Sequence, residues 1–356
     1  MTTEIDTIVA LSHEFGTPEY VKGGGGNTSF KNDTTLWIKP SGTTLGALTA
    51  EAMVEIDRAK LRGLYGWEPP NDVQAREASV KEQMMAAVRP GSKGRPSVET
   101  PMHDCLTATF VVHTHPTLVN GMTCGQGGAA TCAELFPDAL WIPYVHPGYV
   151  LSKQVHDDVA EYAGERGRQP DEIFLENHGL VVAGETAEEI RERHAVILQK
   201  IEEVYASNRL STTLAQEPAP DRSASDRLSD VLESIPALKG SYVHAAGKFS
   251  VAAGPISPDH IVYSKSYALK AEPTATSLAE FQADHGYYPQ VVECEAGVFG
   301  IGATESKARL AVELAEDGAL IEQLVPAFGG IRYLDDASRD FIDNWEVEAF
   351  RRQVKL

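Results

Sequence analysis

Short apolar runs and longer amphipathic runs alternate along the first part of the chain. Residues 34–39 and 107–114 are rich in β-branched and aromatic side chains, which predicts two short buried strands. Residues 172–176, EIFLE, predict a third strand, followed by the turn-like NHG and a further apolar run, LVVAG. This alternation of strand and helix signals predicts an α/β fold.

A helix is predicted for residues 187–206. Thr186 is its expected N-cap and Glu189 completes a capping box, because the hydroxyl and the carboxylate can satisfy free backbone N–H groups at the helix start. Four apolar side chains recur on one face: Ile190, Ile197, Ile201 and Val204. His194 lies on the same stripe, so we interpret it as a packed core histidine.

The apolar pattern breaks at residues 210–226, where Ser, Thr, Ala, Pro and Asp predominate. This composition predicts an exposed linker. It divides the chain into a first domain, residues 1–209, and a smaller α/β domain, residues 227–356. A chain of 356 residues is also long enough to form two separate cores.

The second domain resembles part of the first. From His178 the sequence reads HGLVVAGETAEEIRERHAVI, and from Ala296 it reads AGVFGIGATESKARLAVELA. Both combine a strand, a glycine, a threonine and a helix rich in Ala, Leu or Ile. A second likeness joins LWIKPSGTTL, from Leu36, to VYSKSYAL, from Val262. We predict a degenerate, shortened repeat that lacks the chemistry of the first domain. The alternative is convergence of two β–α units, and a shared strand order would distinguish the two.

The charge of the chain excludes some partners. Its formal net charge is −20, so its surface repels nucleic acid and anionic lipid. No apolar stretch approaches the length of a membrane span, and the acidic N-terminus lacks the features of a signal peptide. We therefore expect a cytoplasmic protein. The four cysteines form no C-x-x-C pair, and we assign them no chemistry.

Three histidines predict a metal site. His113 and His115 alternate in a predicted strand, so their side chains point to one face and one ion can bridge them. Pro116 ends this strand, which places the pair at the strand tip. His178, at another strand junction, is the third candidate. Three neutral imidazoles with an open coordination position are typical of a catalytic zinc site. The competitors for the third place are His103, His146 and His156.

Three segments predict a site for an anion. Residues 21–29, VKGGGGNTS, contain four consecutive glycines, and such loops can form nests of backbone N–H groups. Residues 39–44, KPSGTT, and 95–99, RPSVE, can add hydroxyl and N–H groups. None of the three is a P-loop. Glu99, shortly before the histidine strand, is the candidate acid/base, because a carboxylate can move a proton at a carbon next to a metal-polarised carbonyl.

The motifs GGGGNTS, KPSGTTL, PSVETPMH, HTHP and ENHGLVVAG, in this order, resemble the class II aldolase/adducin family over residues 5–208. The chain is also similar to the aldolase portion of bifunctional rhamnulose-phosphate aldolase/short-chain dehydrogenases. That likeness extends into the second domain through SPDHIVYSK and GVFGIGATESKA. No G-x-G-x-x-G fingerprint in a strand–helix setting is present, so we expect no nicotinamide cofactor.

The resemblance implies a fold and a set of site residues. The fold would be a central, mostly antiparallel sheet between helix layers in a catalytic first domain, with a non-catalytic second domain. His113, His115 and His178 would bind Zn²⁺, or another divalent ion such as Mn²⁺ or Co²⁺, and Glu99 would be the acid/base. The residues around the substrate phosphate would be Gly26, Asn27, Ser41, Gly42 and Ser97. The protein would be a homo-oligomer, commonly a fourfold ring.

The resemblance also implies a reaction. We expect a zinc-dependent aldolase that cleaves a ketose phosphate, similar to rhamnulose or fuculose 1-phosphate, into a dihydroxyacetone-phosphate-like fragment and a short aldehyde. The alternatives are a decarboxylase of a keto-acid phosphate, a 4-epimerase, a dehydratase or a non-catalytic adducin-like module. Glu99 favours the lyase, because the 4-epimerases carry Asp there.

Two positions depart from the pattern of the phosphate-sugar aldolases. Val98 stands where many of them have a second serine, which removes one hydroxyl from the expected phosphate site. The tyrosine that donates a proton from a neighbouring subunit has no clear match, and Tyr144 and Tyr149 are the nearby candidates.

Overall fold

The computed structural model of the protein describes residues 3–345. They form two compact units, which are treated separately. Unit 1 holds the described residues up to Thr123 together with Gly127–Glu203, and unit 2 holds Cys124–Gln126 and the described residues from Val204 on. Within residues 3–345, no helix combines the length and the apolar character that a membrane crossing needs.

Unit 1 is built on a seven-stranded sheet with the order β3-β2-β1-β4-β7-β6-β5. The strands are β1 (Asn27–Lys31), β2 (Thr35–Ile38), β3 (Val54–Asp57), β4 (Phe110–Thr114), β5 (Leu140–Ile142), β6 (Glu172–Leu175) and β7 (Gly179–Gly184). Every neighbouring pair is antiparallel except β5 and β6, which are parallel. The expected α/β fold with a mostly antiparallel sheet is confirmed.

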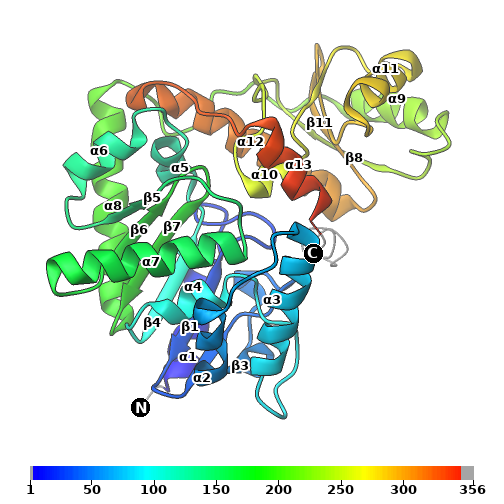
Figure 1. The fold of residues 1–356 in the computed structure, drawn as a ribbon. Coiled ribbons are helices and arrows are strands. Elements are labelled where there is room, and N and C mark those ends of the chain that lie inside the picture. The colour runs from blue at the N-terminus through cyan, green and yellow to red at the C-terminus, as the bar shows by residue number, and fades with distance from the viewer. Residues whose placement is uncertain (1–2, 346–356) are drawn as a thin grey trace. The chain divides into compact units, whose positions relative to one another are not determined.

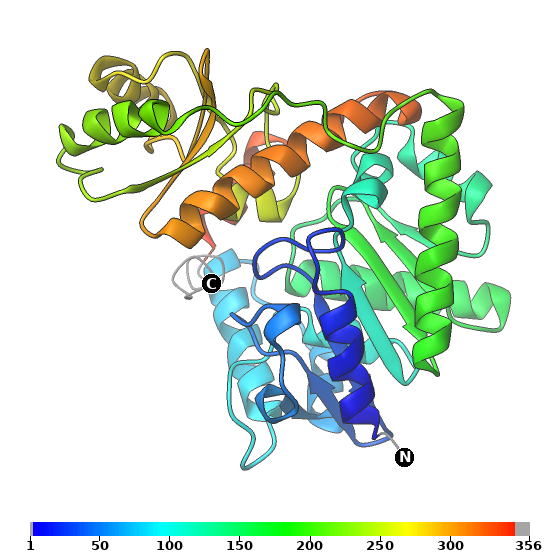
Figure 2. The ribbon, with the colours of Figure 1, turned by 180° about the vertical axis from the view of Figure 1, so that it is seen from behind.

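Helices cover both faces of this sheet. They are α1 (Glu4–Glu14), α2 (Arg58–Leu61), α3 (Val73–Ala87), α4 (Thr100–Cys105), α5 (Thr117–Thr123), α6 (Gly128–Leu135), α7 (Tyr149–Arg166) and α8 (Ala187–Ser207), with 3-10 turns at Leu45–Ala47, Ala50–Ala52 and Arg62–Gly66. Helices α4 and α7 lie on one face (Figure 1) and α1 and α8 on the other (Figure 2). Because successive side chains of a strand point to opposite faces, the residues of β1 and β4 face the α4 and α7 side and the α1 and α8 side in turn.

The long helix α8 forms much as the sequence predicts. The Thr186 hydroxyl accepts a hydrogen bond from the Glu189 N–H at 3.2 Å. The Glu189 carboxylate, however, accepts from the N–H of Glu185 at 2.8 Å rather than from the cap residue itself. His194 is buried, as expected: its Nδ1–H donates to the Ile190 carbonyl at 2.8 Å, and its ring packs on Phe15. Burial lowers the pKa of His194 to about 4, which keeps the ring neutral.

Unit 2 contains a four-stranded sheet with the order β8-β11-β10-β9. Its strands are β8 (Tyr242–Ala246), β9 (Leu269–Lys270), β10 (Val291–Cys294) and β11 (Gly297–Gly302). Its helices are α9 (Arg222–Glu233), α10 (Pro258–Tyr263), α11 (Ala275–His285), α12 (Glu305–Leu324) and α13 (Asp336–Asn344), with a 3-10 turn at Val325–Phe328. Helix α9 begins inside the segment 210–226 that the sequence predicts as a linker, so residues 222–226 are helical.

A buried ion pair joins α2 to α4 in unit 1. The Asp104 carboxylate is fully buried and accepts from the guanidinium groups of Arg58 and, at 3.1 Å, of Arg62. Arg58 is itself only 6 % exposed, and it also donates to the carbonyl of Asn32, in the turn after β1. Asp104 lies near the C-terminal end of α4, the short helix that begins directly after Glu99, so this pair ties that end to α2 and to the turn after β1.

Replacing Asp104 with alanine should therefore destabilise unit 1 strongly. The change leaves the Arg58 charge buried without its carboxylate, which costs about 3–5 kcal/mol in such sites. Asp138→Ala is the control, because Asp138 is 67 % exposed and pairs with Arg166 at the surface, where such pairs contribute roughly 0–1 kcal/mol. Urea unfolding of both variants measures the difference, and equal losses of stability would contradict the assignment.

Candidate metal centre

The end of β4 presents two imidazoles near one corner of the sheet. His113 is completely buried, and its Nδ1–H donates to the Leu180 carbonyl of β7 at 2.9 Å. With Nδ1 turned to this carbonyl, Nε2 of His113 faces the corner where His115 and Glu99 also lie. His115 follows Thr114, the last residue of β4, and its backbone N–H donates to the Tyr20 carbonyl at 2.8 Å.

The turn between β6 and β7 supplies the third imidazole. Asn177 has a positive φ of 51°, a conformation that asparagine adopts more readily than most residues, and its N–H donates to the Thr123 carbonyl. His178 comes next in the turn. Gly179 then passes so close to β4 that a Cβ there would lie 2.4 Å from the Thr114 carbonyl oxygen and 2.7 Å from the His115 ring. Asn177 and Gly179, on either side of His178, are thus each explained by the backbone of the turn.

The three histidine rings converge. Their centroids are 4.7, 5.0 and 4.9 Å apart, and the Nε2 atoms of His113 and His115 are 3.0 Å apart. One ring nitrogen from each of the three lies within 4.8 Å of the others, and this is the only such group of His, Cys, Asp and Glu found in residues 3–345. Zinc–nitrogen bonds of 2.0–2.1 Å in a tetrahedron place ligand nitrogens about 3.3–3.4 Å apart. The donor set therefore fits a divalent metal.

Glu99 reaches into the space between these nitrogens. Its Oε1 lies 3.3 Å from Nε2 of His113 and 3.5 Å from Nε2 of His178. Asn27 donates from Nδ2 to Oε2 of Glu99 at 3.4 Å. The Glu99 side chain is 13 % exposed, so the carboxylate stands beside the three histidines in a largely dry corner.

Opposing effects set the pKa of Glu99. Burial raises it, because desolvation disfavours the charged form, whereas attraction to His113, His178 and His115 and a hydrogen bond from His113 lower it. The attractive effects prevail and hold the pKa of Glu99 well below its usual range. A metal ion in the same position would act on the carboxylate with the same sign. The geometry therefore favours the ionised form of Glu99 whenever a positive charge is beside it.

The glycine-rich loop lies against this corner. Asn27 is the residue of β1 that pairs directly with His113 of β4. Gly26 has a φ of 69°, and a Cβ there would lie 2.6 Å from Val21 and 2.8 Å from the His113 carbonyl oxygen, so only glycine fits. The structure thus brings two of the residues expected around a phosphate, Gly26 and Asn27, next to the histidine group.

The other expected phosphate residues lie on two adjacent turns. Pro40 and Pro96 form an isolated β-bridge, and the Ser41 N–H donates to the Arg95 carbonyl at 2.9 Å. Gly42 follows with a φ of 84°. Ser97 is 8 % exposed, and its hydroxyl accepts from the Glu99 N–H at 3.3 Å. Ser41 and Gly42 therefore adjoin the turn that carries Ser97 and Glu99.

The competing histidines lie outside the converging group. His103 is buried in α4, where its Nδ1 is 2.8 Å from the Ser29 hydroxyl, and burial lowers its pKa to about 3. His156 stacks on the Tyr65 ring at 3.9 Å, and His146 lies near the ring of Tyr144.

The two candidate proton-donating tyrosines lie in different surroundings. Tyr149 is 4 % exposed and packs in an apolar cluster with Leu36, Ile38 and Val54. Its hydroxyl donates to the Leu64 carbonyl at 3.3 Å. The fold of unit 1 thus already uses this hydroxyl. Tyr144 lies in the segment between β5 and α7.

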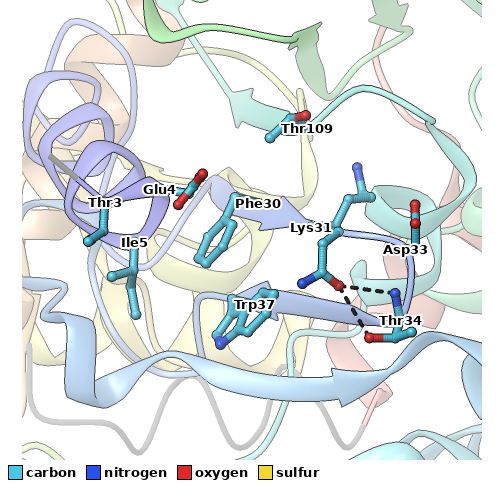
Figure 3. A pocket seen from close by; sticks show the side chains of 10 residues that line it. Thr3, Glu4, Ile5, Phe30, Lys31, Asp33, Thr34, Trp37 and Thr109 are labelled. Atoms are coloured by element: carbon cyan, nitrogen blue, oxygen red, sulfur yellow. Dashed lines mark hydrogen bonds between the residues drawn. The ribbon is translucent and has the colours of Figure 1, made fainter. Parts of the chain in front are cut away.

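An open pocket of about 790 Å³ occupies a different part of unit 1 (Figure 3). It lies between the start of α1 and the strands β1 and β2, and it is lined by the stacked rings of Phe30 and Trp37. Lys31 also lines it. Burial lowers the pKa of that amine to about 7, and the amine donates to the Ala108 carbonyl. None of the three histidines lines this pocket. It also adjoins the end of β1 opposite Asn27, so it is separate from the histidine corner.

Two features of the corner could not be seen in the sequence. One is the Leu180 carbonyl that orients His113, because a backbone acceptor leaves no trace in residue identity. The other is the contact from Asn27 to Glu99, since these residues are far apart in the chain. Only the pairing of β1 with β4 brings them together.

Comparisons with known proteins identify the family of the chain. A family model described as the class II aldolase and adducin N-terminal domain matches residues 6–205. The uncharacterized oxidoreductase YuxG of Bacillus subtilis (strain 168) is 26 % identical over 254 residues, which are 67 % of this chain but 35 % of that protein. The L-fuculose phosphate aldolase of Methanococcus maripaludis is 26 % identical over 220 residues, which are 58 % of this chain and 99 % of that one.

Among solved structures, the N-terminal class II aldolase domain of a conserved protein from Thermoplasma acidophilum is 27 % identical. The match covers 57 % of this chain and 94 % of that one, with a TM-score of 0.49. The family model alone spans more than half of the chain, and it includes the three histidines and Glu99. The chain therefore belongs to the class II aldolase and adducin family.

Proposed function

We propose that the protein is a zinc-dependent lyase that cleaves a ketose phosphate by a retro-aldol reaction. One observation carries the proposal: Oε1 of Glu99 lies 3.3 and 3.5 Å from the Nε2 atoms of His113 and His178. An acid/base beside a set of metal donors is the arrangement that a reaction next to a carbonyl needs. A protein that only binds a partner has no use for it.

The histidines would hold the ion and leave part of its coordination sphere open. His113, His115 and His178 offer three ring nitrogens, and zinc accepts a fourth or fifth ligand in such sites. A bound divalent ion supplies Lewis acidity that polarises a substrate carbonyl. The Leu180 carbonyl holds the His113 ring with Nε2 towards the other two histidines, so the corner is preorganised for binding.

Glu99 would move the proton. As the bond between C3 and C4 of the ketose breaks, the C4 hydroxyl must lose a proton to become the aldehyde, and C3 of the departing ketone fragment must gain one; in the reverse direction C3 loses a proton and the C4 oxygen gains one. The Glu99 carboxylate has the reach for both steps because it stands in the same corner as the three histidines. Asn27 would keep this carboxylate pointed at the reacting carbon.

The phosphate would be held mainly by backbone N–H groups. The protein carries a formal net charge of −20, so an anionic substrate needs a locally positive site. Lys39 is 2 % exposed, and its amine already donates to the Thr43 carbonyl at 2.7 Å. Gly26 and Gly42 both have a positive φ and no side chain. In such turns, neighbouring backbone N–H groups can point towards one anion, so we place the phosphate there. Ser41 and Ser97 would add hydroxyl groups.

The relatives support the substrate class to different degrees. The M. maripaludis relative is named an L-fuculose phosphate aldolase, and the match covers 99 % of it. The name of YuxG as an oxidoreductase is not carried over, because the match covers 35 % of that protein. The homo-oligomeric state that the family resemblance implies stays a prediction, and light scattering of the purified chain would test it.

The first test is product analysis with metal removal. Incubation with fuculose or rhamnulose 1-phosphate should release dihydroxyacetone phosphate and a short aldehyde, both identified by NMR. A chelator should abolish the release and zinc should restore it, because the polarised carbonyl depends on the ion. Carbon dioxide, an epimer or a dehydrated product from other sugar or keto-acid phosphates would assign a different reaction to the same corner. No reaction and no bound metal would leave only a binding role.

Glu99→Gln should lower kcat by about 10²–10⁴-fold, the usual loss when a general acid/base is removed. The amide keeps the shape of the side chain but cannot accept the proton. Zinc content should stay that of the wild type, because the three imidazoles remain. Glu134→Gln, at an exposed position in α6, is the matched control and should behave as wild type. Full turnover in Glu99→Gln would remove Glu99 from the mechanism.

Asn27→Ala should act mainly on kcat. Loss of a hydrogen bond to a charged group is worth about 1.5–3 kcal/mol, so a fall of about 10-fold or more is expected. KM for the phosphate ester should change little, because the backbone N–H groups of the loop remain. Ser41→Ala is the contrast, since Ser41 is expected at the phosphate and should raise KM. A variant at Asn27 that raises KM alone would assign Asn27 to the phosphate instead.

A further inference from the structure

The four-stranded sheet of unit 2 repeats part of the sheet of unit 1. In unit 1, β4 is antiparallel to β7, β7 is antiparallel to β6, and β6 is parallel to β5. In unit 2, β8 is antiparallel to β11, β11 is antiparallel to β10, and β10 is parallel to β9. The strands also follow one another along the chain in the same order, so the two arrangements share both topology and direction.

The helices fit the same correspondence. One helix precedes the first strand in each case, α4 before β4 and α9 before β8. Helices α5 and α6 separate β4 from β5, as α10 separates β8 from β9. Helix α7 precedes β6 as α11 precedes β10, and α8 follows β7 as α12 follows β11. Two unrelated β–α units would match one hairpin and one helix, but not this whole sequence of elements.

The residue register agrees with the topology. Strands β7 and β11 begin at Gly179 and Gly297, end at Gly184 and Gly302, and are each followed two residues later by a threonine. Both threonines cap the next helix: Thr186 accepts from the Glu189 N–H at 3.2 Å, and Thr304 accepts from the Lys307 N–H at 3.2 Å.

Matching close contacts strengthen the correspondence. A Cβ on Gly179 would lie 2.4 Å from the Thr114 carbonyl oxygen, and a Cβ on Gly297 would lie 2.7 Å from the Ala246 carbonyl oxygen. Thr114 pairs with Leu180, and Ala246 pairs with Val298, so these two carbonyls occupy the same place in their sheets.

One of the two sequence likenesses is wrong. The match between Leu36 and Val262 fails, because Leu36 lies in β2 whereas Val262 lies in α10. In the part of the chain that the structure describes, unit 2 has no counterpart of β1, β2 or β3, since β8 is an edge strand of its sheet. The repeat is therefore limited to the half of the fold from α4 to α8.

The register shows what stands in place of the histidines. His113 pairs with Val181, and the corresponding pair in unit 2 is Ala245 with Phe299. His115 corresponds to Gly247, two residues further on. The hairpin that carries His178 is also shorter: residues 176–178 join Leu175 to Gly179, but residues 295–296 alone join Cys294 to Gly297. All three donor positions have thus lost their imidazole.

The segment before α9 covers the vacated corner. The Glu217 N–H donates to the Lys248 carbonyl at 3.0 Å, and a Cβ on Gly247 would lie 1.5 Å from the Glu217 carbonyl oxygen. Pro220 lies against Gly297, 3.3 Å from the place of a Cβ there. Residues 217–220 therefore pass over the two glycines that correspond to His115 and Gly179. No side chain larger than hydrogen fits at Gly247 while this segment stays in place.

We propose that unit 2 is a shortened second copy of the α4–α8 half of unit 1, with its metal corner closed by residues 217–220. Unit 2 is then not a second active site, and the chain carries a single metal centre. The metal count rests on the proposed function of unit 1, whereas the closed corner does not.

The metal count is measured on the full chain. Elemental analysis after zinc loading and dialysis should give one zinc per chain for the wild type and none for the variant with His113→Ala, His115→Ala and His178→Ala. Circular dichroism checks that this variant is folded. One zinc retained in the folded triple variant would overturn the proposal. A wild type without zinc would count against the proposed function alone and would leave the closed corner to the second experiment.

The closed corner is tested by Gly247→Ala with Gly164→Ala as control. Gly164 lies in α7, and nothing lies within 4 Å of the place of its Cβ, so alanine is tolerated there. Gly247→Ala must displace residues 217–220, so proteolysis within residues 211–221 should speed up at least 10-fold while zinc content stays unchanged. Unchanged protection would overturn the proposal.

A measurement on the wild type covers the case in which Gly247→Ala does not fold. Hydrogen exchange should be slower at the amide of Glu217, which donates to Lys248, than at that of the exposed Ser211. Equal exchange rates at the two amides would contradict the position of residues 217–220 in the closed corner.

Discussion

The candidate site depends on the antiparallel pairing of β4 with β7. This register places His113 opposite Val181 and Thr114 opposite Leu180, so the tip of β4 meets the turn that begins β7. One imidazole from β4, one from the residue after its end and one from the adjacent hairpin then share a corner. The close approach at Gly179 is the cost of this arrangement, because any side chain there would strike the Thr114 carbonyl. Strand geometry, rather than flexible side chains, sets the positions of the donors.

The pairing of β1 with β4 contributes to the electrostatics of the corner. Strand β1 lies on the other side of β4, so Asn27 faces the histidines and reaches Glu99. Burial alone would raise the pKa of Glu99, but the neighbouring imidazoles outweigh it. A buried carboxylate whose pKa is shifted by specific neighbouring charges is typical of functional sites. The buried Asp104 pair anchors the C-terminal end of α4, the short helix that begins directly after Glu99.

The two units differ at the tips of their corresponding strands. The hairpin of unit 1 has one more residue than that of unit 2, and that turn carries His178. Where the other two donors would stand, unit 2 has Ala245 and Gly247. Because these residues are small, residues 217–220 can occupy the corner that corresponds to the metal site of unit 1. The strand order survives these changes because it depends on the apolar faces of the sheet and on α12, not on the polar residues at its tip.

The sequence alone determined the α/β class, the helix at residues 187–206 with its threonine cap, and the pair His113 and His115, because period, capping and strand alternation are local properties. It ranked His178 first for the third place, and the pairing of β4 with β7 brings His178 to the other two. It also placed Glu99 and the loop containing Gly26 among the candidates. Tertiary structure decided what local pattern cannot carry: that Asn27 contacts Glu99, that a Leu180 carbonyl orients the His113 ring, and that Val262 lies in a helix rather than a strand. Each of these depends on which strands become neighbours, and strand pairing joins residues that are distant along the chain.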